Sequence, residues 1–200
     1  MDLGFDAATH TYKLGGSVVP SVTQVLAPLY DFSGIPRDVL ERRRQIGVAL
    51  DEAILLDLGD DLDEATLGPE LQGPFEAWRR FRSEQRFALC AAQYPVASKK
   101  YRYAGTPDAW GLINDVETLA DWKATAAMHP AVALQTAAYA AAGAEMGLFK
   151  PSIRRCGVRF QDDGRYVIEP FKDKADFAVF FSLLSIHNWR ARHGLLKGTQ

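Results

Sequence analysis

The chain has 200 residues, of which 48% are hydrophobic and 24% charged, and its formal net charge is −2. These values fit a soluble globular protein, and we expect residues 1–200 to form a single domain. A net charge this small excludes a protein that coats nucleic acid by bulk positive charge. The most apolar stretch, 131–148, is mostly alanine and contains Gln135 and Glu145, so we expect no membrane span.

The cysteines and histidines restrict the kinds of metal site. Cys90 and Cys156 lie far apart in strand-like segments, which predicts two buried free thiols in a reducing compartment. Two cysteines cannot supply the four thiolates of an iron–sulfur cluster or a Cys-rich zinc site, and the four histidines lack ligand spacing. Any metal should therefore be a hard cation held by carboxylates. Because residues 1–10 have neither a basic segment nor an apolar core, we expect no signal peptide and a cytoplasmic protein.

Positive charge is bunched along the chain. The basic runs lie at 42–44, 79–82, 99–102, 154–159 and 190–192. Taken singly, such a run is typical of a solvated surface. Together they could follow a phosphate backbone if they surrounded one cleft.

Patterns in the first part of the chain predict a hairpin and two helices. Residues 10–19 fit a small hairpin that turns at Gly15-Gly16. A short helix follows, with Ser21 as its N-cap. Residues 36–56 keep roughly helical apolar spacing and begin with a proline, which the first turn of a helix tolerates.

The middle of the chain predicts a loop and another helix. The stretch 59–68 is acidic and fits a loop. A second long helix fits 69–86, and we expect Gly73-Pro74 to interrupt its start.

The remaining segments alternate between strand and helix patterns. Strands are predicted at 87–92, 96–103, 106–113, 118–123, 153–160 and 166–171. Helices are predicted at 130–146 and 174–192. This order indicates the α/β class (α+β in a broader sense), with a mixed central β-sheet flanked by helices.

The segment from Asp108 to Lys123 carries the clearest chemical signal. Side chains alternate along a strand, so Asp121 and Lys123 should share a face while Trp122 points to the other. A hairpin through Asn114 would fold Asp108 back beside Asp121. On the following helix, residues four positions apart share one face, which places Gln135 and Tyr139 together.

This grouping suits metal-dependent hydrolysis of a phosphodiester. Asp108 and Asp121 would bind Mg²⁺, with Mn²⁺ as a substitute, through oxygen. A bound metal polarises the phosphate and lowers the pKa of a coordinated water. Lys123 would orient that water, stabilise the developing negative charge, or act as a base if burial lowered its pKa. The residues alone leave these roles open.

At this point the chain resembles the PD-(D/E)XK nuclease superfamily, in its RecB-like and lambda-exonuclease-like branch. The ordered motifs are GTPD at 105–108, DWK at 121–123 and QTAAY at 135–139. The upstream PSVTQVL, at 20–26, is similar to the leader of phage and prophage members. The resemblance implies a restriction-endonuclease-like core and metal-dependent DNA cleavage, commonly from DNA ends.

Residue by residue, the resemblance makes Asp108 and Asp121 metal ligands and Lys123 the catalytic lysine. Gln135 and Tyr139 would face DNA or support the site. For these two, the alternatives are a local polar contact for the glutamine and a core aromatic for the tyrosine.

Ser21 and Thr23, in the leader motif, would also bind DNA or support the site. The chain departs from the family at two further positions. Where many members have Gly-xxx-His on a helix, this chain has Gly47 followed by Asp51, a candidate third metal ligand or a surface residue. Where many have a strand glutamate, it has Gln93, a weaker ligand.

Three functional hypotheses follow. The first is an exonuclease acting on duplex ends or single strands in recombination or repair, in a bacterial or phage-infected cell. The second is a DNA- or protein-binding module of the same fold with weakened catalysis, suggested by Asp51 and Gln93. The third is a structure-specific endonuclease. The family also leaves open a homo-oligomer and a single-strand annealing or recombination partner.

Overall fold

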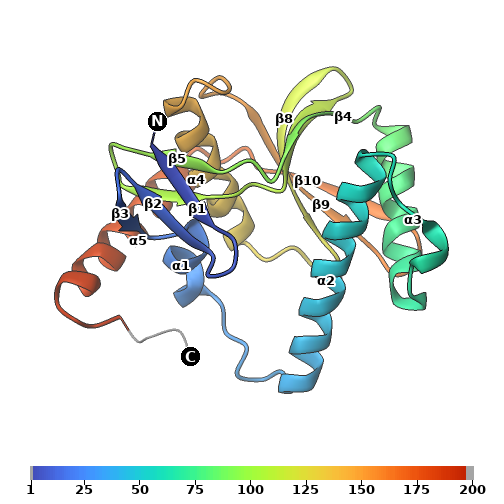
Figure 1. Cartoon of the computed structure of the whole chain (residues 1–200), viewed down its shortest axis with the longest axis horizontal. Coiled ribbons are helices and arrows are strands. Elements are labelled where there is room, and N and C mark those ends of the chain that lie inside the picture. The colour runs from blue at the N-terminus through green and yellow to red at the C-terminus, as the bar shows by residue number, and fades with distance from the viewer. Residues whose placement is uncertain (1, 197–200) are drawn as a thin grey trace.

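Apolar runs between residues 88 and 170 pair into a five-stranded sheet. The computed structural model describes residues 2–196, and its main sheet has the order β10-β9-β8-β7-β4 (Figure 1). The strands are β4 (Ala88–Ala92), β7 (Ala109–Ile113), β8 (Val116–Lys123), β9 (Arg154–Phe160) and β10 (Tyr166–Pro170). Strands β8 and β9 are parallel and the other neighbours antiparallel, so the sheet is mixed, as expected.

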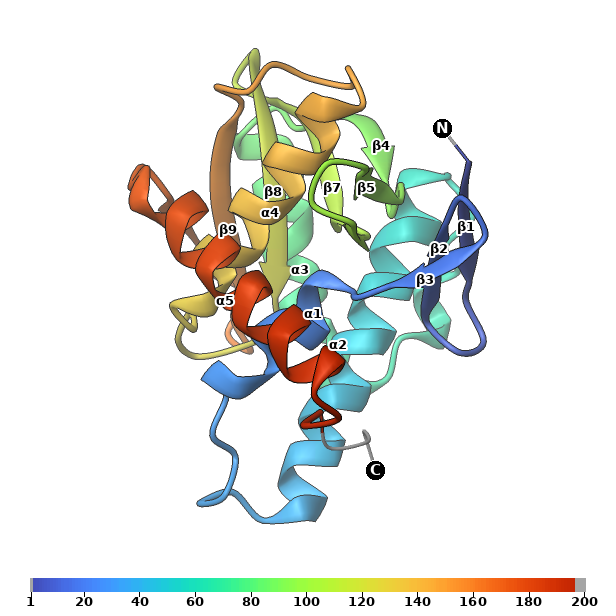
Figure 2. The ribbon, with the colours of Figure 1, turned by 90° about the vertical axis from the view of Figure 1, so that its left-hand side faces the viewer.

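Helices cover both faces of this sheet. One face packs against α2 (Arg37–Leu58) and α3 (Pro69–Glu84), and the other against α1 (Val22–Leu26), α4 (Ala131–Glu145) and α5 (Ala175–Arg192) (Figure 2). Alternation along β8 divides its side chains between two cores. Ala120 and Trp122 join the core under α2 and α3, whereas Leu119 joins the core under α4. The expected α/β class with helices flanking a mixed sheet is therefore confirmed.

Two smaller sheets adjoin the main one. The expected hairpin forms from β2 (Thr11–Leu14) and β3 (Ser17–Val19), with Gly15 and Gly16 both at positive φ. It gains a third strand, β1 (Leu3–Asp6), which the sequence analysis missed. A two-stranded sheet of β5 (Val96–Ser98) and β6 (Tyr103–Gly105) packs beside it, sharing a small third core.

The continuous strand expected at 96–103 is wrong, because the chain turns between β5 and β6. The carboxylate of Glu145, at the end of α4, accepts the backbone N–H groups of Lys99 and Lys100 at 2.8 and 3.0 Å. Arg102 adopts a left-handed φ of 53° and closes the turn. The next strand also starts later than expected, at Ala109.

The break expected in α3 is also wrong, because the helix runs through Gly73 and Pro74 without interruption. Gly73 is needed for another reason: a Cβ there would lie 1.9 Å from the carbonyl oxygen of Asp162. The glycine thus lets α3 approach the turn between β9 and β10. The acidic loop at 59–68 contains a short 3-10 helix, η2 (Glu64–Thr66).

Two smaller expectations have mixed outcomes. Both cysteines are free thiols, but only Cys156 is buried; Cys90, on the edge strand β4, is exposed. Burial raises the pKa of the Cys156 thiol to about 12. Within residues 2–196, no helix is both long enough and apolar enough to cross a membrane.

Candidate active site

The β7–β8 hairpin brings Asp108 and Asp121 together. Asn114 and Asp115 both adopt positive φ and close the turn, and the register pairs Ala109 with Ala120. The next opposed positions along the two strands are therefore Asp108 and Asp121. The Asp108 carboxylate also accepts the backbone N–H of Trp122, with 2.9 Å between Oδ2 and N.

Lys123 lies between the two carboxylates. Its Nζ is 2.6 Å from Oδ2 of Asp121 and 3.6 Å from Oδ2 of Asp108. It also donates to the carbonyl of Trp122 at 3.1 Å. The predicted geometry is confirmed: Asp121 and Lys123 share one face of β8, and the Trp122 side chain packs into the opposite core.

Asp121 is the least satisfied polar group of the described residues. It is 1% exposed, and neither carboxylate oxygen has a hydrogen-bond partner with acceptable geometry. The close Lys123 ammonium provides an ion pair, but its approach does not meet the angular requirements of a hydrogen bond. Burial, only partly offset by Lys123 and reinforced by Asp108, raises the pKa of Asp121 to about 7.

The charges around Lys123 fix its protonation state. Burial by itself would lower the pKa of its amine, but the carboxylates of Asp121 and Asp108 outweigh that effect and raise the pKa above its usual range. Lys123 is therefore an ammonium at neutral pH. Its side chain remains one-third exposed, so it can still reach a bound molecule.

Asp51, on α2, interacts with Asp108, Asp121 and Lys123 through its charge. Burial, with a further contribution from the charge of Asp108, raises the pKa of Asp51 to about 7. The charge of Lys123 acts to lower this pKa, and that of Asp121 acts to raise it. Among residues 2–196, however, no three Asp, Glu, His or Cys side chains already stand together as a metal-binding group.

The donor set fits a hard divalent cation. All the candidate ligands, Asp51, Asp108 and Asp121, offer carboxylate oxygens, which such ions prefer. The buried carboxylate of Asp121 lacks hydrogen bonds, and coordination to a cation would satisfy it.

The glycine of the GTPD motif, Gly105, packs so closely against Tyr139 that a side chain would not fit. A Cβ at Gly105 would lie 2.5 Å from Cε1 of Tyr139 and 3.1 Å from Cγ2 of Val22. The next residue, Thr106, shares a 2.7 Å hydrogen bond with the hydroxyl of Tyr12. The segment leading to Asp108 is therefore held by close packing on one side and by a hydrogen bond on the other.

Tyr139 and Gln135 form a buried pair on α4. The amide Nε2 of Gln135 donates to the Tyr139 hydroxyl at 3.1 Å, and the two residues are 8% and 3% exposed. Burial, assisted by the charge of Asp121, raises the pKa of Tyr139 above its usual range. Both residues thus lie against the site, and the tyrosine also has the core-packing role that was the alternative for it.

The remaining candidates have mainly backbone or capping contacts. Gln93 is exposed and has a φ of 46°, and its N–H donates to the carbonyl of Asp108 at 3.0 Å. Ser21 is buried and caps α1 through a reciprocal capping box with Gln24. Its hydroxyl lies 3.0 Å from that of Thr23, which is exposed. Gln93 and Ser21 therefore hold the backbone near the site.

Two aromatic residues near the site were missed by the sequence analysis. Tyr30 follows η1 (Ala27–Leu29), and the charges of Lys123 and Asp121 act on its hydroxyl, whose pKa is raised chiefly by burial. The ring of His129 stacks on it, with 4.3 Å between centroids. Both lie in irregular segments with no periodic pattern, so no sequence signal pointed to them.

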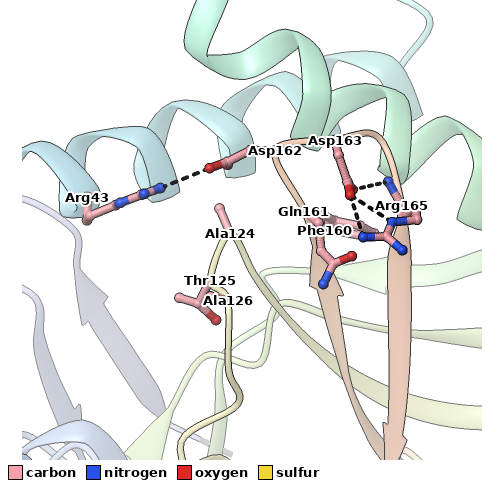
Figure 3. A pocket seen from close by; sticks show the side chains of 9 residues that line it. All are labelled: Arg43, Ala124, Thr125, Ala126, Phe160, Gln161, Asp162, Asp163 and Arg165. Carbon is pink, nitrogen blue, oxygen red and sulfur yellow. Dashed lines mark hydrogen bonds and ion pairs between the residues drawn. The ribbon is translucent and has the colours of Figure 1, made fainter.

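A pocket of about 250 Å³ opens beside the end of β8 (Figure 3). Its lining comes from α2, from the segment after Lys123 and from the β9–β10 turn: Arg43, Ala124, Thr125, Ala126, Phe160, Gln161, Asp162, Asp163 and Arg165. Figure 3 shows Arg43 reaching Asp162 across the opening, at 3.5 Å from Nη1 to Oδ2. The three catalytic candidates do not line this pocket, so it adjoins their site.

Many of the clustered arginines are paired with acidic side chains. The pairs are Arg42–Glu70, Arg43–Asp162, Arg44–Glu41, Arg79–Glu64, Arg80–Glu84, Arg82–Asp57, Arg155–Asp176 and Arg159–Glu169. Arg155 is 4% exposed and joins β9 to α5, which is a structural role. Many of the charges in the basic runs therefore belong to solvated or structural ion pairs.

The sequence matches no model of a known protein family and no curated protein. Among solved structures it is similar to LHK-Exo in complex with dAMP, with 14% identity, 88% of this chain and 89% of that chain covered, and a TM-score of 0.46. It is also similar to an alkaline exonuclease (LHK-Exo) from Laribacter hongkongensis, with 15% identity, 88% of each chain covered and a TM-score of 0.42. Values this low do not define a family for this chain.

Proposed function

We propose that this protein is a metal-dependent deoxyribonuclease of the PD-(D/E)XK type that acts on DNA ends in recombination or repair. The observation that carries the proposal is the buried carboxylate of Asp121, which lacks hydrogen bonds and lies beside Asp108 and Lys123. A protein seldom buries such a group without a function or a ligand that satisfies it.

Each residue has a chemical role in this proposal. Asp108 and Asp121 would hold Mg²⁺ or Mn²⁺, and Asp51, whose carboxylate interacts with both through its charge, would tune the charge of the site. The bound ion would supply Lewis acidity to the phosphate and a more acidic water. Lys123 is kept protonated, so of its candidate roles we favour stabilising the negative charge of the pentavalent phosphate over acting as a base.

The test is cleavage of end-labelled linear duplex and single-stranded DNA, beside closed circular DNA, with Mg²⁺, Mn²⁺ or EDTA. We expect metal-dependent loss of linear DNA while circles are spared. Lys123→Ala should reduce the rate by about 10²–10³-fold, the usual effect of removing one donor to a developing oxyanion. Lys150→Ala, which removes an exposed lysine just beyond α4, is the matched control and should cut normally.

The same assay separates the alternatives. Cleavage of closed circles would favour the structure-specific endonuclease. A folded protein that cuts nothing with either metal would favour the binding module. One observation favours the binding module: among the described residues, no three Asp, Glu, His or Cys side chains are grouped so that they could hold a metal ion.

A further inference from the structure

Three aromatic rings stack in the segments that flank the candidate active site. Tyr30 lies 4.3 Å from His129 between ring centroids, at an interplanar angle of 29°, and 5.7 Å from Phe32, at 14°. We name these three residues the aromatic stack. The near-parallel rings come from segments about 100 positions apart in sequence, so tertiary structure alone brings them together.

The aromatic stack adjoins the catalytic candidates. His129 lies in the loop between β8, which ends at Lys123, and α4, while Tyr30 and Phe32 lie in the connection from α1 to α2, below the sheet in Figure 1. The charges of Lys123 and Asp121 both act on the Tyr30 hydroxyl. A molecule whose phosphate reached Lys123 would therefore have its neighbouring groups close to these rings.

Local contacts fix two of the rings. Tyr30 packs against the core that includes α1, α4 and α5. The imidazole Nδ1 of His129 accepts the backbone N–H of Ala131 at 3.1 Å, which fixes the orientation of its ring. Rings held in this way lose little conformational entropy when a flat ligand stacks on them.

Phe32 is an apolar side chain whose exposure to solvent does not stabilise the fold. It is 48% exposed, and two apolar neighbours in the same segment, Leu29 and Ile35, are 39% and 43% exposed. The segment itself is ordered by local bonds: Asp31 accepts the N–H of Ser33, and Phe32 accepts that of Ile35. The ring is thus presented to solvent from a structured turn.

We propose that the aromatic stack is a platform for an unpaired nucleobase of the DNA strand bound at Asp108, Asp121 and Lys123. Every base has a π-face, so aromatic side chains bind single strands without regard to sequence. The adjacent Lys123 ammonium supplies the charge that complements the phosphate. The inference rests on the proposed function and deepens it: the strand is single, or frayed from its partner, where it enters the site.

The test distinguishes binding of the nucleobases from binding of the phosphate backbone. Anisotropy would measure the binding of two fluorescein-labelled strands in Ca²⁺: a twelve-nucleotide oligothymidine and a strand of equal length in which every base is replaced by hydrogen. The variants are Phe32→Ala, Phe32→Trp and, as matched control, Trp189→Ala. Trp189 is also half exposed and contacts a histidine, but it lies on α5.

We expect Phe32→Ala to weaken binding of oligothymidine by roughly 5- to 150-fold, the range for losing one stacked base, and to leave binding of the abasic strand unchanged. Phe32→Trp should restore affinity, and Trp189→Ala should change neither. Equal weakening of both strands, no effect of Phe32→Ala, or no binding of oligothymidine by the wild type would overturn the inference. Because binding is measured apart from cleavage, failure of the nuclease proposal would be seen separately.

Discussion

Replacing Gly105 by alanine tests how the GTPD segment is held. The new Cβ would lie 2.5 Å from Cε1 of Tyr139 and 3.1 Å from Cγ2 of Val22. Tyr139 is 3% exposed and Val22 is fully buried, so neither side chain can move aside freely. The clash therefore has to be relieved by shifting the strand or the ring.

Two opposing contributions decide whether Gly105→Ala raises or lowers the free energy of unfolding. Gly105 does not have a positive φ, so alanine fits its backbone and should stabilise by about 0.4–1 kcal/mol through the unfolded state. Overpacking of a buried site costs typically about 1–3 kcal/mol. The clash is well inside contact distance, so we expect the second term to win and Gly105→Ala to lower the free energy of unfolding by about 1–2 kcal/mol.

The assay is urea unfolding followed by tryptophan fluorescence, with Gly47→Ala as the matched control. A Cβ at Gly47, inside α2, would meet nothing within 4 Å, so this variant should be more stable by about 0.5–1 kcal/mol. Tyr139→Leu should remove most of the cost of Gly105→Ala in the double variant. A stability of Gly105→Ala equal to or above wild type would refute the steric argument.

Three further predictions concern stability. Arg155→Met should lower the free energy of unfolding by about 1–3 kcal/mol, measured by thermal and urea unfolding, because it leaves the partly buried Asp176 carboxylate and the carbonyl of Ala133 without their donor. Ser21→Ala should cost about 1 kcal/mol in the same assay through loss of the N-cap, and Ser21→Asn, which can also cap, should restore it. Burial raises the pKa of Asp121 and of Asp51 to about 7, so the folded protein holds protons that the unfolded chain releases above about pH 4. This stabilisation is present below that pH and is lost as the pH rises to about 7, so in EDTA the urea midpoint should fall between pH 5 and pH 8; a midpoint that rises would contradict the raised pKa values.

The sequence by itself determined the local part of the candidate site. The two-residue period of a strand puts Asp121 and Lys123 on one face and Trp122 on the other, whatever the rest of the fold does. The Asn114-Asp115 turn fixes the hairpin register, because both residues tolerate positive φ, and the register places Asp108 opposite Asp121. These relations depend on neighbours within about fifteen positions of the chain.

Other features were decided only by the tertiary structure. The turn between β5 and β6 is stabilised by Glu145, more than forty positions away, so the local pattern at 96–103 resembled one strand. Gly73 appeared to be a helix breaker, yet its role is to admit the backbone of Asp162. In both cases a long-range contact outweighed the local propensity of the chain.

The same division applies to the site. Its carboxylates and lysine follow from strand geometry, but burial that raises the pKa of Asp121, and the packing of Tyr139 on Gly105, depend on α4 covering the sheet. The stacking of Tyr30 on His129 joins two irregular segments, which carry no periodic signal. The order of residues determines the short-range geometry of the site, whereas burial and long-range contacts form only when the helices pack against the strands.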